Sequence, residues 1–338
     1  MALLVAINIL AAAQEPVSAP PIPQIVEYSV GLSSGAFPAY ITAGPDGNVW
    51  FAEVGANAIG RITPDGVITE FSAGITPNSG PTGITAGPDG NLWFTEQQGA
   101  TGTPGAIGRI TPEGVVTEFR TGLDPASNVF GITAGQDGNL WFTTSEFLGS
   151  QTINKIGRIT TAGVITLFSQ GITPNSGALL ITPGSDGKLW FSEEAVPGMA
   201  NISVHGKVTE FRTGFNPNAH AWGVTRASDG NVWFTKSFNP LNPVLAPAVG
   251  KITPAGVVTE YPLGDLTADP RGIVFYQGGL WFTEYGADKI GHMTLSGKIQ
   301  QISGITQYAG AYAICVGPDG NLWFTELFGN RIGKVVLP

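Results

Sequence analysis

Few side chains in this sequence are suited to acid–base or nucleophilic chemistry. The 338 residues include three histidines and one cysteine. His205 lies in a glycine turn (SVHGK), and Cys315 lies in an apolar run (AYAICVG), where we expect a buried thiol rather than a nucleophile. His292 replaces an arginine of a recurring IGR segment. His220 is the remaining candidate, either as a general base or ligand or as the partner in a loop hydrogen bond.

Glutamates recur at the end of a repeated W-F-T-E segment. The seven copies of this position are Glu53, Glu96, Thr144, Glu193, Lys236, Glu284 and Glu326. Carboxylate oxygens are the ligands that Mg²⁺ prefers in proteins. Glu326, Glu284 and Glu193 are therefore the candidate metal ligands. The alternative is that these carboxylates hydrogen-bond to neighbouring backbone amides.

A second set of equivalent positions precedes a repeated G-I-T segment and varies inside that uniform frame. Its members are Ala39, Thr82, Phe130, Leu179, Trp222, Arg271 and Tyr312. Aromatic rings at three of them can stack on a flat or cyclic ligand, and Arg271 can pair with a carboxylate or carbonyl. We predict a ligand site formed by Phe130, Trp222, Arg271 and Tyr312, with His220 and Tyr312 as the candidate catalytic groups. The alternative is that the aromatic rings fill a channel.

Both sets of positions belong to one internal repeat. The decapeptide GPDGNLWFTE occupies residues 87–96 and returns at residues 317–326, and its relatives raise the number of copies to seven. The motif tryptophans are Trp50, Trp93, Trp141, Trp190, Trp233, Trp281 and Trp323. Each unit contains four short β-branched or aromatic segments bounded by glycine turns, which predicts four strands. We expect the tryptophan and phenylalanine of the motif to pack between neighbouring units as scaffold.

This pattern predicts an all-β fold, a seven-bladed β-propeller with four antiparallel strands per blade. The last unit, residues 311–338, has room for only three strands. We expect residues 25–30 (IVEYSV) to pair with the strand containing Lys334–Leu337 and so close the ring. Residues 22–338 then form a single domain. The two sets of residues surround one mouth of the central channel, where blades 2, 3 and 5 carry the longest connections.

Composition and the N-terminus bear on partners and location. The net charge is −9 and no cluster of lysines and arginines is present, which argues against a nucleic-acid partner. An apolar stretch followed by small residues and prolines in residues 1–21 predicts a signal peptide and linker, too short for a membrane span. We expect an extracytoplasmic monomer, periplasmic or secreted, that binds a small-molecule or peptide-like ligand at the channel mouth.

The repeated pattern GIT-x-G-x-DG-x-LWFTE…IGRIT…G-x-ITEF over residues 25–338 resembles the streptogramin B (virginiamycin B) lyases. The resemblance implies a seven-bladed propeller and an enzyme of antibiotic resistance that opens a cyclic depsipeptide by elimination. In that reaction a histidine removes the proton alpha to the ester carbonyl, and carboxylate-bound Mg²⁺ polarises the carbonyl.

The histidine motifs of the family are altered in this chain. P-H-A-I-T and E-P-H-G-I-T correspond to DPRGIV (269–274) and GAYAIC (310–315). Arg271 stands in for the first histidine, Tyr312 for the base and Gly310 for a metal-binding glutamate, whereas Glu326 matches. A tyrosine, with a reference pKa of about 10, is a poor base at neutral pH.

Two functions stay open on this sequence. The first is a binding or interaction propeller that uses the aromatic and acidic mouth. The second is an enzyme, either a Mg²⁺-dependent carbon–oxygen lyase rebuilt around His220 and the glutamates or a related lactone-cleaving enzyme.

Overall fold

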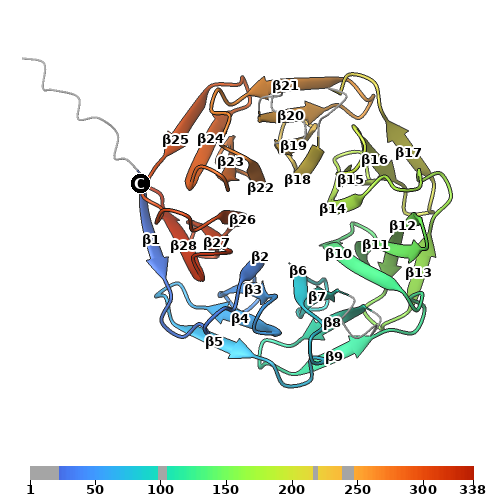
Figure 1. Ribbon diagram of the computed structural model, residues 1–338, viewed down its shortest axis with the longest axis horizontal. Helices are drawn as coiled ribbons and strands as arrows, with labels where there is room; N and C mark the ends of the chain where they lie inside the picture. The colour runs from blue at the N-terminus through green and yellow to red at the C-terminus, as the bar shows by residue number, and fades with distance from the viewer. Residues whose placement is uncertain (1–22, 98–104, 216–219, 238–246) are drawn as a thin grey trace, which may run out of the picture.

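The structure, a computed structural model, describes residues 23–97, 105–215, 220–237 and 247–338. Seven sheets of four antiparallel strands stand around a central axis (Figure 1). This arrangement confirms the predicted all-β, seven-bladed propeller. In the described part of the chain, no helix is long and apolar enough to cross a membrane.

Each blade runs from an inner strand beside the axis to an outer strand at the rim. Blades 1 to 3 consist of β2 (Pro38–Ala43), β3 (Val49–Glu53), β4 (Ala58–Ile62), β5 (Ile68–Phe71); β6 (Pro81–Ala86), β7 (Leu92–Glu96), β8 (Ala106–Ile110), β9 (Val116–Phe119); and β10 (Ser127–Ala134), β11 (Leu140–Leu148), β12 (Gln151–Ile159), β13 (Ile165–Phe168). Blades 4 and 5 consist of β14 (Ala178–Pro183), β15 (Leu189–Glu193), β16 (Met199–Ile202), β17 (Val208–Phe211); and β18 (His220–Arg226), β19 (Val232–Ser237), β20 (Ala248–Ile252), β21 (Val258–Pro262). Blades 6 and 7 consist of β22 (Pro270–Tyr276), β23 (Gly279–Glu284), β24 (Lys289–Thr294), β25 (Ile299–Ile302); and β26 (Ala311–Val316), β27 (Leu322–Glu326), β28 (Arg331–Val336) with β1 (Gln24–Tyr28).

The N-terminal strand closes the ring, as the sequence predicts. β1 pairs antiparallel with β28, from Gln24 opposite Val336 to Tyr28 opposite Ile332. The two ends of the chain therefore meet in one sheet (Figure 1). The Tyr28 ring stacks on the motif tryptophan of this blade, Trp323, at a centroid distance of 5.6 Å. The pairing gives the last blade its fourth strand and covers the edge of β28.

The repeated W-F pair packs between blades and confirms the scaffold role predicted for it. Trp50 of blade 1 shares a buried cluster with Ile84 and Phe94 of blade 2. The turn aspartate of the motif holds the indole, since Asp46 Oδ1 accepts a hydrogen bond of 2.9 Å from Trp50 Nε1. Glycine is required in the IGR segment because a Cβ on Gly60 would collide with the Phe51 ring. These packing and hydrogen-bond contacts explain why the motif is repeated, and a catalytic role is not needed to explain it.

Blade 6 departs from that pattern and accounts for His292. Its turn lacks the aspartate, and the buried Trp281 Nε1 has no hydrogen-bond partner among the described residues. The His292 ring stacks on Trp281 at 4.2 Å, in the place where Arg61 lies over Trp50 in blade 1. Burial lowers the pKa of His292. The residue is a packing element of the blade.

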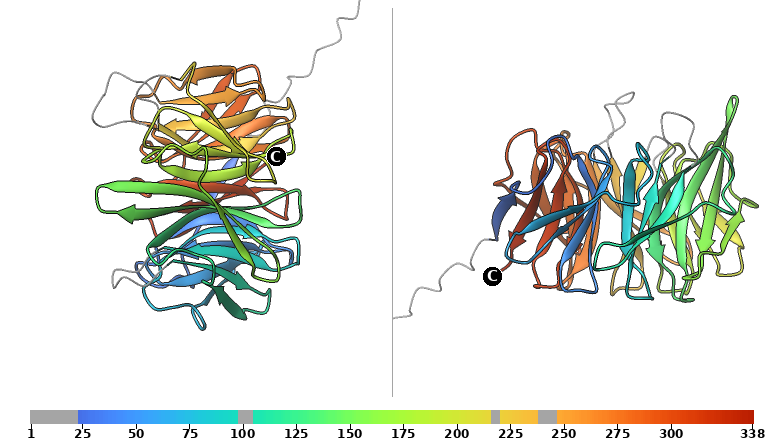
Figure 2. Two further views of the ribbon diagram at one scale, coloured as in Figure 1. Left: turned by 90° about the vertical axis from the view of Figure 1, so that its right-hand side faces the viewer. Right: turned by 90° about the horizontal axis from the view of Figure 1, so that it is seen from below.

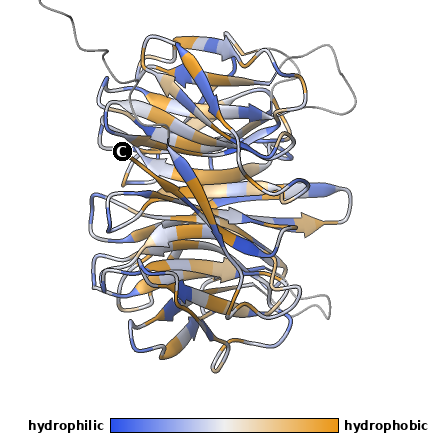
Figure 3. Cartoon of the chain, turned by 90° about the vertical axis from the view of Figure 1, so that its left-hand side faces the viewer, coloured by the Kyte–Doolittle hydropathy of each residue, from blue (hydrophilic) through white to orange (hydrophobic). Residues whose placement is uncertain are grey.

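The connection after the second strand of blade 3 differs from the loop expected there. β11 and β12 continue as a hairpin of nine-residue strands, paired as far as Leu148 opposite Gln151. The hairpin stands out from the ring beyond the neighbouring blades (Figure 2). Hydrophobic and hydrophilic stretches follow one another along the strands of the propeller (Figure 3). The expected signal peptide and parts of the long connections of blades 2 and 5 lie outside the described residues.

Candidate ligand site at the channel mouth

The threonine of the W-F-T-E segment fixes the backbone of the variable residues at the mouth. Thr235 Oγ1 accepts a hydrogen bond from Gly223 N in its own blade (2.8 Å) and donates one to the Arg271 carbonyl of the next blade (2.6 Å). Thr283 makes the same two bonds, to Gly272 N and to the Tyr312 carbonyl. The scaffold motif therefore sets the position of the residues expected to bind a ligand.

A cluster of four aromatic rings and one guanidinium lies at the mouth. We call Tyr40, Trp222, Arg271, Tyr285 and Tyr312 the mouth cluster. The Arg271 guanidinium carbon lies 3.9 Å from the centroid of Trp222 and 5.1 Å from that of Tyr285. The Tyr312 ring meets Trp222 at 6.4 Å, Tyr285 at 6.0 Å and Tyr40 at 5.4 Å, each edge to face. Trp222, Arg271 and Tyr312, three of the predicted ligand residues, are thus brought together.

Arg271 is held by an ion pair as well as by its ring contacts. Its Nη2 donates a hydrogen bond of 2.8 Å to Asp269 Oδ2, and Asp269 also accepts one from the Ser237 hydroxyl. The Nε atom of Arg271 is buried and has no partner among the described residues. A guanidinium held on two sides by rings and on one by a carboxylate keeps a fixed direction.

Tyr40 of the mouth cluster also lines a small cavity between the inner strands. It occupies the position that is glycine in most blades, as at Gly83 and Gly223. Beyond it an apolar cavity of about 140 Å³ is lined by Tyr40, Leu180 and isoleucines of the inner strands. Burial raises the pKa of Tyr40 and of Tyr312, and the two phenol groups interact with each other. Both phenols therefore stay protonated at neutral pH and do not accept a proton.

His220 is held by a loop. Its Nδ1 contacts the backbone carbonyl of Glu194, which is the hydrogen-bond alternative considered from the sequence. The Glu194 side chain lies close enough to His220 and Arg271 for their charges to lower its pKa, although burial, the larger effect, raises it overall. Glu194, one residue beyond the repeated glutamate position, thus joins the mouth.

The repeated glutamates do not line the mouth together. Glu193 is bound by Arg212, Glu284 by Gln301 Nε2 (2.7 Å), and Glu326 lies 3.7 Å from Arg331 Nη1. All three carboxylates are fully buried, in three different blades. Each partner belongs to the same blade as its glutamate. The residues that directly follow two of these strands, Glu194 and Tyr285, lie next to Arg271 instead.

The donor set therefore does not fit a shared Mg²⁺ ion. Within the described residues, no three histidine, cysteine, aspartate or glutamate side chains gather as metal ligands. Gly310 stands where the family resemblance places a metal-binding glutamate. It adopts a positive φ of 66°, and its N–H donates to Asp288 Oδ1 at 2.9 Å.

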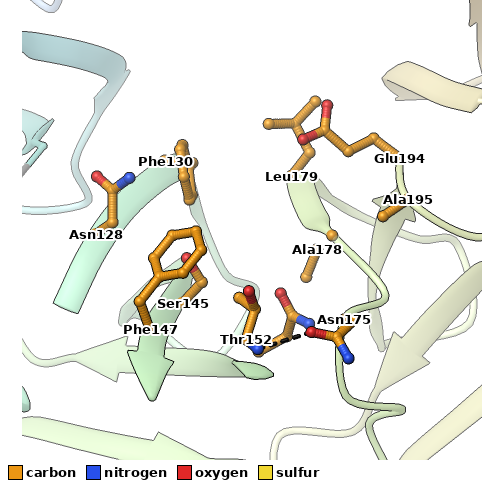
Figure 4. A pocket seen from close by; sticks show the side chains of 12 residues that line it. Asn128, Phe130, Ser145, Phe147, Thr152, Asn175, Ala178, Leu179, Glu194 and Ala195 are labelled. Atoms are coloured by element: carbon orange, nitrogen blue, oxygen red, sulfur yellow. Dashed lines mark hydrogen bonds between the residues drawn. The ribbon is translucent and has the colours of Figure 1, made fainter. Parts of the chain in front are cut away.

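Phe130, the fourth predicted ligand residue, lines a separate cavity of about 320 Å³ between blades 3 and 4 (Figure 4). Phe147 from the extended hairpin lies beside Phe130, and Ala178 and Leu179 of β14 lie across the opening. Glu194 forms part of the same wall. The structure thus places Phe130 apart from the mouth cluster, with Glu194 between the two regions.

Family membership follows from comparison with known proteins. The model of the virginiamycin B lyase family matches residues 21–147 and 147–337. The chain belongs to the virginiamycin B lyase family. A streptogramin B lyase structure is 32% identical, with 94% of this chain and 98% of that chain covered and a TM-score of 0.80. A virginiamycin B lyase from Staphylococcus aureus is 33% identical, covers 94% and 99% and has a TM-score of 0.79.

A third virginiamycin B lyase structure from Staphylococcus aureus is described as a catalytically inactive histidine-to-alanine variant with quinupristin. It is 32% identical, with 94% and 100% coverage and a TM-score of 0.80. A gluconolactonase from Xanthomonas campestris, 10% identical with a TM-score of 0.56, shares the fold alone. Comparison with curated proteins finds no match. In this member of the virginiamycin B lyase family, Arg271 and Tyr312 occupy the positions where the resemblance places histidines.

Proposed function

We propose that this member of the virginiamycin B lyase family is an exported binding protein that holds a compact, peptide-like ligand at the channel mouth. The observation that carries the proposal is the stacking of Arg271 between Trp222 and Tyr285, with Tyr312 alongside. A rigid cation framed by aromatic faces binds a carbonyl or carboxylate through its N–H groups while the rings cover the apolar parts of the ligand.

The mouth cluster is poorly suited to the elimination reaction that the family resemblance implies. Burial raises the pKa of Tyr312, so its phenol stays protonated at neutral pH. Arg271 remains a cation and cannot act as a base. General-base catalysis contributes about 10²- to 10⁴-fold, and its loss alone would slow the reaction severely. The alternative, a carbon–oxygen lyase, would need His220 or Glu194 to accept the proton.

Tryptophan fluorescence tests the proposal because the chain supplies its own control. Seven of its eight tryptophans are the buried motif residues, and Trp222 is the eighth. Virginiamycin B added to the protein should change the emission of Trp222, and Trp222→Phe should abolish that change. Mass spectrometry of the same samples, with Mg²⁺ present, should recover the antibiotic in its cyclic form.

Two results would contradict the proposal. The first is an unchanged emission at virginiamycin B concentrations far above those at which a genuine lyase is saturated, which would exclude this ligand class. The second is rapid linearisation of the antibiotic. In that case, loss of turnover in Tyr312→Phe, His220→Ala or Glu194→Gln would identify the base and establish the lyase alternative.

Export is the second part of the proposal and has a separate test. When the full-length sequence is expressed, the protein should accumulate outside the cytoplasm. Its N-terminus should then begin after the apolar stretch, at about residue 13. N-terminal sequencing of the fractionated protein gives the answer, and an intact cytoplasmic chain would refute export without affecting the ligand site.

A further inference from the structure

We propose that the cavity between blades 3 and 4 is a second subsite, which takes one uncharged aromatic or branched aliphatic side chain of a peptide-like ligand. The inference rests on the proposed function, because it assigns a part of the ligand to a region distinct from the mouth cluster. It is carried by the way the two walls of the cavity are built and by the chemistry of their lining.

The first wall of the cavity includes the long hairpin of blade 3, whose strands are the longest among the described residues. β11 and β12 each have nine residues, against four to six in the second and third strands of the other blades. Phe147 lies near the tip of this hairpin, beside Phe130 of β10 (Figure 4). Its side chain is 62% exposed, although burial of a phenylalanine ring is strongly favourable. Phe130 and Phe147 thus both contribute apolar surface to this wall, and the Phe147 ring still has an open side.

The opposite wall is held in place by hydrogen bonds to its backbone. Asn175 N of the 175–177 turn donates a hydrogen bond of 2.8 Å to the Thr152 carbonyl of the hairpin. Asn175 Oδ1 in turn accepts from Thr152 N of the hairpin at 2.7 Å. The hairpin and the turn are therefore tied together across the base of the cavity, which is preformed.

Gly177 brings this turn close to Glu194. It has a positive φ of 71°, and a Cβ there would lie 2.8 Å from Ala195 N and 2.9 Å from Glu194 Cγ. Only glycine allows this approach without displacing the wall. The Glu194–Ala195 backbone consequently lies close against the turn, and Glu194 lines the edge of the cavity.

The lining selects the chemical class of the occupant. Phe130, Phe147, Ala178, Leu179 and Ala195 supply apolar surface, and polar groups are confined to side-chain amides and hydroxyls apart from Glu194. A volume of about 320 Å³ lies at the lower end of ligand-pocket sizes, roughly 300–1,000 Å³, and accommodates a single side chain with its peptide unit. Glu194 disfavours an anion at this edge.

One ligand can reach both regions because Glu194 borders each of them. Glu194 lines the cavity. It also lies near enough to two residues of the mouth cluster for electrostatic effects, since the charge of Arg271 lowers the pKa of Glu194 and the charge of Glu194 raises the pKa of Tyr312. A peptide-like molecule with an aromatic residue in the cavity would therefore present its neighbouring backbone carbonyl to Arg271. The cavity sets which side chain the protein prefers, and the mouth cluster binds the backbone.

The test uses three small probes and a matched pair of variants. N-acetyl-L-phenylalaninamide, N-acetylglycinamide and N-acetyl-L-phenylalanine are titrated into the isotopically labelled full chain, and NMR shifts of the backbone amides of Phe130, Leu179 and Glu194 are followed. Phe147→Ala is compared with Leu148→Ala, since Leu148 is the next residue of the same hairpin, is 55% exposed and does not line the cavity.

The phenylalaninamide should bind with shifts at the three amides, the glycine probe should not bind, and the carboxylate probe should bind more weakly. Phe147→Ala should weaken binding of the phenylalaninamide about tenfold, whereas Leu148→Ala should leave its affinity unchanged. Equal weakening by both variants, shifts confined to other residues, or equal affinity for the glycine probe would overturn the subsite.

The two proposals fail separately. A Trp222 fluorescence response to virginiamycin B without phenylalaninamide binding would leave the mouth site in place and remove the subsite. Specific phenylalaninamide binding without any response of Trp222 to the antibiotic would support the cavity and reject the proposed function.

Discussion

The guanidinium of Arg271 lies 3.9 Å from the centre of the Trp222 ring, although the two residues belong to inner strands of neighbouring blades. A planar guanidinium can lie flat on a ring face and still direct its N–H groups at a ligand, whereas an ammonium over a ring is a point charge without that fixed geometry. The relationship leads directly to a prediction about binding.

Arg271→Lys should weaken ligand binding at the mouth nearly as much as Arg271→Ala, by about tenfold, although it keeps the charge. The affinity is measured from Trp222 fluorescence with virginiamycin B as the probe. Lys251→Arg, which changes a cation over the motif Trp233 in the outer part of blade 5, serves as the control. An unchanged ligand affinity of Arg271→Lys would mean that charge alone, rather than stacking, holds the ligand.

The buried carboxyl of Glu53 makes stability depend on pH. Burial, followed by the charge of Glu70, raises the pKa of Glu53 to about 9, and neither carboxyl oxygen has a partner in the described part of the chain. Ser72 stands where Arg120 and Arg212 neutralise the equivalent pairs in blades 2 and 4. Blade 1 therefore carries this carboxyl pair without an arginine.

A carboxyl whose pKa is higher in the folded than in the unfolded chain stabilises the fold fully below the unfolded pKa, near 4. That contribution is lost as the pH rises toward 9. Glu53→Gln should therefore change the melting temperature little at pH 5 and raise it at pH 8–9. The free energy of unfolding at pH 8–9 should increase by roughly 1–3 kcal/mol. Thermal unfolding across this range is the measurement. The exposed Asp65→Asn should show no such trend, and a parallel shift in both variants would refute the assignment.

The hydroxyl of Thr235 should matter for binding as well as for stability. Thr235→Val keeps the shape and removes the hydrogen bonds to Gly223 N and to the Arg271 carbonyl. A buried N–H and a carbonyl are left unsatisfied, at a cost of about 1–3 kcal/mol each. We expect a lower melting temperature and a weaker Trp222 response. Thr95→Val removes the hydrogen bond to the Phe130 carbonyl instead, so it should destabilise the fold similarly but leave Arg271 in place. Identical ligand affinity of the two variants would show that the Thr235 hydroxyl does not position the site.

Removal of the closing strand should destabilise the whole ring. Deletion of residues 1–31 removes β1, which contributes Ile25 to a buried cluster and the Tyr28 ring to Trp323. We expect a lower melting temperature and aggregation through the exposed edge of β28. Deletion of residues 1–22 leaves β1 intact and should melt like the full chain. Equal stability of both truncated chains would show that the pairing contributes little.

The fold was predictable because each level of the sequence agreed with the others. Seven W-F motifs at near-equal spacing, glycine turns and the incomplete last unit all indicated a closed propeller. The site was harder to predict from the sequence. Trp222, Arg271 and Tyr312 stood out as variable positions in a uniform repeat, and the structure brings them together.

The missing members of the site needed information that local patterns do not carry. Tyr40 was overlooked because it replaces a repeated glycine, and a ring at such a position can fill the channel only if the opposite blades leave space. The repeated glutamates were expected at the mouth, but alternation along the strand turns Glu193 away and Glu194 toward it. An insertion of equal length can be a loop or a hairpin, and pairing between β11 and β12 decides which.

The pairing of β1 with β28 also determines how the molecule responds to mechanical force. Gln24 lies opposite Val336, so the chain enters and leaves the sheet at the same end of the pair. Tension between the segment before Gln24 and the segment after Val336 loads the backbone hydrogen bonds of this pair one after another, as in a zipper, rather than all at once in shear. The ring should open at low force with six blades still intact, which makes the seam the weakest link of an otherwise closed structure.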